Sequence, residues 1–197
     1  MNRRHACLGL ASWMGLGALA PVHAHGLLGS VTPPLALPSV VVTLDDGRRV
    51  PLASVLQGRL TALQLMFTGC SALCPVQGAV FAELQSLVLR GTALAGTVRP
   101  QALQLLSVSI DVLGDDARTL AAWRARFGAG PQWRAAVPDP AGIDPLLDRL
   151  RGRTGGPDRH TTQVFVLDGR GRLVYRCAEL AAAESVAQVL RQRPLVA

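Results

Sequence analysis

Two cysteines, Cys70 and Cys74, are the residues whose type and spacing most directly suggest chemistry. They lie in the run FTGCSALCP, where an apolar stretch over residues 60–67 gives way to a predicted helix over residues 73–90. On a helix, residues four apart share one face with Cβ atoms about 5–6 Å apart, so two sulfurs can bind one soft metal ion. A disulfide needs Cβ atoms about 3.5–4.5 Å apart, so the first turn would have to deform and the bond should be reversible.

The strand-to-helix junction predicts that the two thiols differ in acidity. Residues 60–67 are predicted to form a buried strand, Thr68-Gly69 marks the break, and Pro75 is tolerated in the first turn of a helix. A thiol at a helix N-terminus faces unpaired N–H groups and the positive end of the helix dipole, which lower its pKa. We therefore expect Cys70 to be the more acidic thiol. The alternative that both cysteines only fill the core stays open, because free cysteine is among the most buried residue types.

The rest of the chain predicts alternating strands and helices. Expected strands cover residues 40–44, 48–50, 60–67, 102–110, 132–137, 162–167 and 172–176, and expected helices cover residues 73–90, 115–127, 143–151 and 179–191. The first two strands form an N-terminal hairpin around Asp45-Asp46-Gly47, and the last two form a second hairpin. This order predicts an α/β fold, a thioredoxin-like sandwich of a central mixed sheet with flanking helices.

His160 is the one histidine inside the expected domain, because the other three lie at or near the N-terminus. It ends a loop rich in glycine, proline and arginine, just before the strand over residues 162–167. In a thioredoxin-like sheet this loop faces the helix start that carries the thiols. A lone histidine is most often an ordinary surface residue, but this position favours a third ligand. Two thiolates and one imidazole suit Cu(I), and Cu(II) with an added oxygen ligand.

The first residues predict an export signal. Two arginines precede a short apolar run, and the VHA sequence at residues 22–24 fits a small-x-small cleavage pattern. We expect a signal peptide over residues 1–24, a proline-rich linker over residues 25–38 and one domain over residues 39–197. The apolar run is shorter than the roughly 20 residues of a membrane-spanning helix, which favours cleavage over a membrane anchor. The expected location is the periplasm or the outer face of the inner membrane.

The charge pattern does not predict nucleic-acid binding. The chain has a formal net charge of +7, but its arginines are scattered with little aromatic interleaving, as on a solvated basic surface. Cys177 is a third cysteine of the expected mature chain, and an odd number cannot all pair internally. It is interpreted as a buried strand-end cysteine, with a regulatory or intermolecular thiol as the alternative.

Together these features resemble the Sco/SenC family of copper-binding, thioredoxin-like assembly proteins. The matching segments are FTGCSALCP, SVSID at residues 107–111, Phe127, Arg159-His160 and DGRG at residues 168–171. The resemblance implies an exported or membrane-anchored protein that binds copper through Cys70, Cys74 and His160. It also implies service to the dinuclear copper centre of cytochrome c oxidase as metal donor, thiol reductant or both. The family usually has proline after the first cysteine and an Asp-Pro pair, where this chain has Ser71 and Asp111-Val112.

The leading interpretation is a copper chaperone whose partner is the copper-site subunit of cytochrome c oxidase or another periplasmic copper protein. The alternative is an enzyme, a periplasmic thiol-disulfide oxidoreductase in which Cys70 attacks and Cys74 resolves. A thiol peroxidase is the third interpretation. A three-coordinate copper site requires His160, whereas an electron-exchange enzyme does not. The three-residue spacer favours metal, because dedicated oxidoreductases generally use a two-residue spacer.

Overall fold

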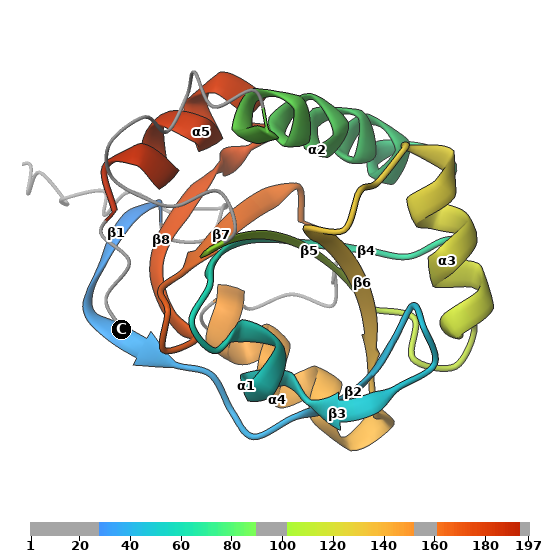
Figure 1. Ribbon diagram of the computed structural model, residues 1–197. Helices are drawn as coiled ribbons and strands as arrows, with labels where there is room; N and C mark the ends of the chain where they lie inside the picture. The colour runs from blue at the N-terminus through green and yellow to red at the C-terminus, as the bar shows by residue number, and fades with distance from the viewer. Residues whose placement is uncertain (1–27, 90–101, 152–160, 194–197) are drawn as a thin grey trace, which may run out of the picture.

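The computed structural model describes residues 28–89, 102–151 and 161–193 (Figure 1). Within these ranges eight strands form one sheet in the order β1-β8-β7-β4-β5-β6-β2-β3. The strands are β1 (Gly29–Ala36), β2 (Val41–Leu44), β3 (Arg49–Pro51), β4 (Leu60–Met66), β5 (Leu103–Ser109), β6 (Trp133–Pro138), β7 (Gln163–Leu167) and β8 (Arg172–Glu179). The helices are α1 (Leu52–Leu56), α2 (Leu73–Leu89), α3 (Ala117–Arg126), α4 (Pro140–Arg151) and α5 (Ala183–Arg191).

Strand β4 lies inside the sheet and brings the thiol loop to its carboxyl edge. It pairs in parallel with β5, in register from Leu60 with Leu103 to Met66 with Ser109, and antiparallel with β7. Every residue of β4 is buried, because helices cover both faces of the sheet. The Ile110 N–H donates to the Met66 carbonyl at 2.8 Å, so the loops that follow β4 and β5 start side by side.

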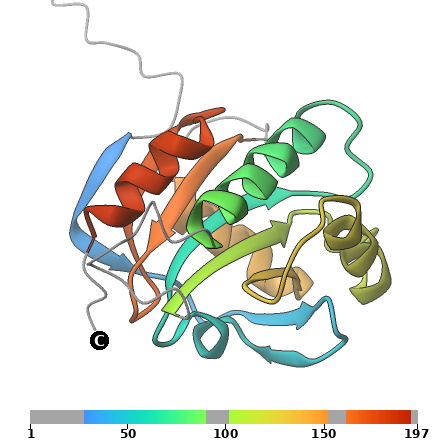
Figure 2. The same ribbon diagram turned by 45° about the horizontal axis from the view of Figure 1, so that its top comes forward.

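Helices cover the two faces of the sheet in separate layers. Helices α2 and α5 lie side by side on one face, and α1 and α4 lie on the other, as Figures 1 and 2 show. In α4 the buried positions are Ile143, Leu146, Leu147 and Leu150, the spacing of one helical face. The predicted mixed α/β sandwich with an N-terminal hairpin is confirmed. No helix of the described part is both long and apolar enough to cross a membrane.

Most of the segment predicted as a linker over residues 25–38 belongs to the sheet. Residues Gly29–Ala36 form β1, which pairs antiparallel with β8 at one edge of the sheet. Proline cannot donate to a strand ladder, so a run with Pro33 and Pro34 did not suggest a strand. An edge strand tolerates it, and the register with β8 shifts between Ser30 and Leu35, around the two prolines. The short helix α1 was also missed, because five residues carry little periodicity.

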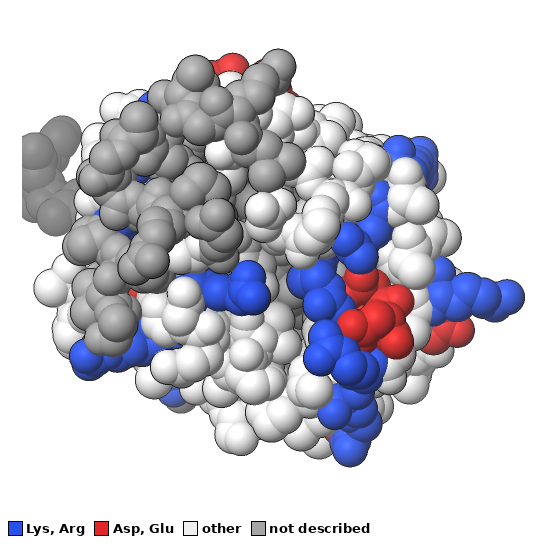
Figure 3. All heavy atoms as spheres, viewed as in Figure 1, with Lys and Arg blue, Asp and Glu red and all other residues white. Residues whose placement is uncertain are grey.

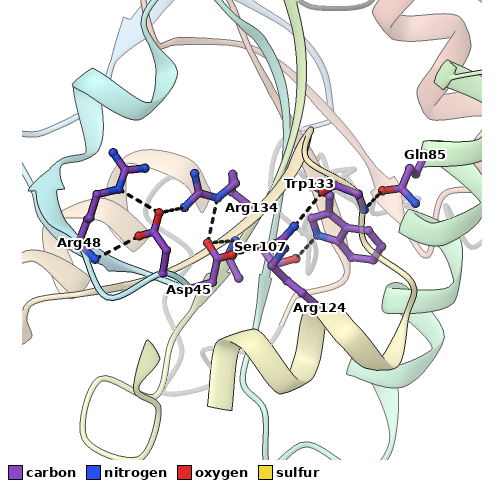
Figure 4. A network of polar contacts seen from close by, with 10 residues as sticks. Asp45, Arg48, Gln85, Ser107, Arg124, Trp133 and Arg134 are labelled. Atoms are coloured by element: carbon purple, nitrogen blue, oxygen red, sulfur yellow. Dashed lines mark hydrogen bonds and ion pairs between the residues drawn. The ribbon is translucent and has the colours of Figure 1, made fainter. Parts of the chain in front are cut away.

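The hairpin of β2 and β3 is fixed to the rest of the fold by carboxylates at its turn. Asp45 is buried and forms ion pairs with Arg124 of α3 and with Arg134 of β6, the latter at 3.0 Å. Asp46 pairs with Arg134 at 2.8 Å and with Arg48 at 2.9 Å. Figure 4 shows Asp45, Arg48 and Arg134 of this network. Figure 3 shows acidic and basic side chains interleaved over one side of this face. The arginines here therefore pair with carboxylates rather than form a uniform basic surface.

Candidate metal and thiol site

A buried carboxylate fixes the loop that carries the first thiol. Asp115 accepts hydrogen bonds from the Thr68 N–H at 3.0 Å, from the Thr68 hydroxyl and from the Ser109 hydroxyl at 2.5 Å. The sequence predicted that Asp115 begins the next helix. Instead α3 begins at Ala117 with Asp116 as its N-cap, in a capping box with Thr119. Asp115 does not cap the helix, and its carboxylate instead accepts hydrogen bonds from the turn before Cys70, a role that sequence reasoning missed.

Cys74 lies in the first turn of α2 and Cys70 lies just before it, as predicted. Cys70 and Cys74 are 9% and 7% exposed, and neither forms a disulfide. The Cys74 N–H donates to the Cys70 Sγ at 3.3 Å, so the first sulfur accepts a hydrogen bond from the helix start. Both side chains belong to a small apolar cluster with Met66, Trp123 and other residues of α3 and β6.

The two thiols differ in acidity in the predicted sense. Burial alone would raise the pKa of Cys70, but hydrogen bonds from the Cys74 thiol and from backbone N–H groups of the first helical turn outweigh it and lower the pKa. Burial raises the pKa of the Cys74 thiol, and its hydrogen bond to Cys70 raises it further. Deprotonation therefore starts at Cys70. This is the arrangement of an attacking or first-binding thiol beside a buried second one.

A pocket beside Cys74 is also lined by Thr161, the chain neighbour of His160. Its wall includes Cys74, Gln77, Phe67 and Thr161. The Glu179 carboxylate fixes the far side, since it accepts from the Thr161 hydroxyl at 2.7 Å. His160 itself lies outside the described residues. Within the described ranges, no cluster of three or more His, Cys, Asp or Glu side chains could hold a metal ion.

Gln77 is the second residue of this site that sequence reasoning missed. It is 1% exposed, lines the pocket with Cys74, and neither its amide nitrogen nor its amide oxygen has a hydrogen-bond partner in the structure as described. The signal in the sequence is its spacing, because a residue three positions after Cys74 on a helix lies on the same face. A buried polar group without a partner is rare in folded proteins.

The third cysteine lies apart from this site. Cys177 is in β8, is buried, and packs in the core between the sheet and the layer of α2 and α5. Burial raises its pKa to about 12, so it is a poor nucleophile near neutral pH. These observations support the interpretation of Cys177 as a core residue.

The rim of the site is apolar and open to solvent. Leu73 and Val76 of the first turns of α2 are exposed on either side of buried Cys74 in the sequence. Leu113, in the loop after β5, is the most exposed large apolar residue of the described part of the chain. Leu73 and Val76 are three residues apart on α2 and so lie on one helix face, and contiguous exposed apolar surface is typical of sites that contact another protein.

Comparison with known proteins places this architecture in one family. No curated protein matches the chain. Among solved structures, Bradyrhizobium japonicum ScoI with copper bound matches at a TM-score of 0.62 with 19% identity, over 80% of this chain and 98% of that one. Yeast Sco1 with copper bound matches at a TM-score of 0.65 with 13% identity, over 81% and 88% of the two chains. BsSco matches at a TM-score of 0.63 with 16% identity, over 81% of this chain and 93% of that one. It is described as having a disulfide switch and as a member of the Sco family of cytochrome c oxidase assembly proteins.

At these identities the solved structures establish a shared fold. The sequence itself carries the stronger statement, because the family model for SCO1/SenC matches residues 42–193. That range contains both thiols, Asp115, Gln77 and the wall of the pocket. The match spans most of the sequence, and the chain therefore belongs to the SCO1/SenC family.

Proposed function

We propose that this protein is an exported copper chaperone in which Cys70, Cys74 and His160 bind copper. The observation that carries the proposal is the pocket shared by Cys74 and Thr161, because Thr161 is the chain neighbour of His160. Two sulfurs and an imidazole form a soft donor set for Cu(I), and Cu(II) would need an added oxygen ligand. Copper bound to ScoI of Bradyrhizobium japonicum and to yeast Sco1 supports the choice of metal.

Copper uptake requires both sulfurs to be thiolates. The lowered pKa of Cys70 makes this thiol the first to lose its proton, whereas the raised pKa of Cys74 means that the metal must displace a proton there. Binding should therefore release protons and weaken as the pH falls. The hydrogen bond from the Cys74 N–H to the Cys70 Sγ stabilises negative charge on the first sulfur.

The proposed recipient is the copper-site subunit of cytochrome c oxidase or another periplasmic copper protein. BsSco belongs to a family described as cytochrome c oxidase assembly proteins, which supports this class of partner. The exposed Leu73 and Val76 give the site an apolar rim that a protein partner could cover during transfer. We further propose export, with cleavage after Ala24, on the charged start and short apolar run of the first residues.

The test is the variant His160→Ala. Loss of one of three ligands is expected to weaken Cu(I) binding by at least the roughly 10–100-fold seen for outer-shell partners, while the thiols still cycle between dithiol and disulfide. A competition titration against a Cu(I) chelator, beside a disulfide-reduction assay, measures both properties. Arg159→Ala is the matched control, because it changes the adjacent residue without removing a proposed ligand. Unchanged Cu(I) affinity in His160→Ala would remove His160 from the site.

The second candidate is a thiol-disulfide oxidoreductase. The observation that favours it is the acidic Cys70 next to the buried, less acidic Cys74, as expected for an attacking and a resolving thiol. In this case disulfide exchange should not require His160, and the reduced protein should retain no copper. Metal analysis of the reduced protein after removal of loosely bound copper decides between the two functions.

A further inference from the structure

The side chain of Gln77 makes no hydrogen bond to a described residue that would explain why a polar residue is buried at this position. Both polar atoms of its side chain are buried and lack a partner in the part of the chain that the structure describes. It lies in α2 and lines the same pocket as Cys74. A leucine of similar size would fill this space without a buried unpaired amide. The metal-free protein is therefore expected to be less stable with glutamine at position 77 than with leucine.

The position of Gln77 connects this amide to the second thiol. Gln77 follows Cys74 by three residues on α2, which places both side chains on one face of the helix. The Cys70 sulfur already accepts the Cys74 N–H, whereas Cys74 and the unpaired amide of Gln77 line the same pocket. A thiolate is a hydrogen-bond acceptor, and an amide NH₂ has two hydrogens to donate.

We propose that the side-chain NH₂ of Gln77 donates a hydrogen bond to the Cys74 sulfur when that sulfur is a metal-bound thiolate, and so strengthens the binding of soft cations. Gln77 is thus a positioning residue for the site and not a ligand. The inference rests on the proposed copper function, and it deepens that function by naming a residue that tunes the affinity. Polar groups around metal ligands commonly set affinity in this way.

The test compares Gln77→Leu with the parent protein. Cu(I) affinity, measured by competition against a chelator, is expected to fall about 10-fold or more. The metal-free variant should unfold at the same or a higher temperature than the parent, because the unpaired amide is gone. Gln64→Leu is the control for metal affinity, since Gln64 is also a buried glutamine but does not line the pocket, and its amide NH₂ donates to the Ser107 hydroxyl. Its Cu(I) affinity should equal that of the parent.

A second probe, Cd²⁺, separates this inference from the proposed function. Cd²⁺ binds thiolates and reports them through a sulfur-to-metal charge-transfer band. Loss of an N–H···S bond raises the energy of the sulfur lone pairs, so the band should move to lower energy in Gln77→Leu, an effect that packing alone does not predict. If the parent retains no Cu(I), the copper function fails, and the Cd²⁺ comparison still decides the role of Gln77.

Equal affinity and an unshifted band in Gln77→Leu and the parent would overturn the inference and leave the copper function intact. Should the leucine variant fail to fold by circular dichroism, Gln77→Ala replaces it in the same two titrations. The alanine variant removes the amide without adding bulk. If Gln77→Ala binds Cd²⁺ as tightly as the parent protein does, the inference is overturned as well.

Discussion

Replacement of Asp115 by alanine is expected to lower the free energy of unfolding by about 3 kcal/mol and to loosen the loop that carries Cys70. The carboxylate accepts from three donors, namely the N–H and hydroxyl of Thr68 and the hydroxyl of Ser109. Thr68 and Gly69 form the turn that leads from β4 to the first thiol. Asp115 therefore couples the stability of the fold to the position of Cys70.

The magnitude follows from what each donor can do after the carboxylate is removed. The Thr68 N–H is fixed by the backbone, and a partly buried donor without a partner costs about 2 kcal/mol. The two hydroxyls can rotate toward other acceptors or water, so we assign about 1 kcal/mol to both together. The total is a large part of the roughly 5–15 kcal/mol that stabilises a typical domain.

Two measurements test this prediction on the reduced, metal-free protein. Urea unfolding gives the change in stability, and alkylation of Cys70, followed by peptide mass mapping, gives the accessibility of the loop. Asp115→Ala should be less stable and should react faster at Cys70. Asp116→Ala is the matched control, because the neighbouring carboxylate caps α3 and its loss should cost about 1 kcal/mol without changing the alkylation of Cys70.

The reasoning would be refuted by a variant Asp115→Ala that unfolds at the same urea concentration as the parent. It would also be refuted if both aspartate variants increased the alkylation of Cys70 equally. The second outcome would mean that any damage near α3 opens the thiol loop, and that the three hydrogen bonds to Asp115 have no specific role.

Three further predictions concern the core, the third cysteine and the hairpin. Gly78→Ala should destabilise the protein by about 1–3 kcal/mol in urea unfolding, because a Cβ there would overlap the ring of Phe127. Cys177 has a raised pKa, so its thiol stays protonated in the folded state, while the unfolded chain loses that proton above about pH 9. Between pH 9 and 12 the free energy of unfolding of the parent should therefore fall by about 1.4 kcal/mol per pH unit more than that of Cys177→Val, as measured by urea unfolding. Asp45→Ala should cost about 2 kcal/mol, since it removes the carboxylate partner of Arg124 and one of the two carboxylate partners of Arg134. The more exposed Asp46→Ala should cost less than about 1 kcal/mol, and a reversed order would contradict the account of this network.

Most of the fold was predictable because its strands and helices are strongly patterned. The strand β4 is a mostly apolar, fully buried run that is followed by a Thr-Gly break, and α2 begins at Leu73 as expected. The strand β1 was not predictable, because its two prolines are compatible with a strand only at the edge of a sheet. The end of β8 was placed too early, since Glu179 continues the strand and binds Thr161 and Thr162, residues distant in the sequence.

By itself the sequence determined the pair Cys70 and Cys74, their position at a strand-to-helix junction and the order of their acidity, because these depend on local spacing and on the helix start. His160 as a third ligand stays a prediction, since this residue lies outside the described ranges. Only the tertiary structure decided that Asp115 turns toward the thiol loop and that the amide of Gln77 remains unpaired beside Cys74. A side chain's partner is set by the elements packed around it, and the local sequence does not contain that information.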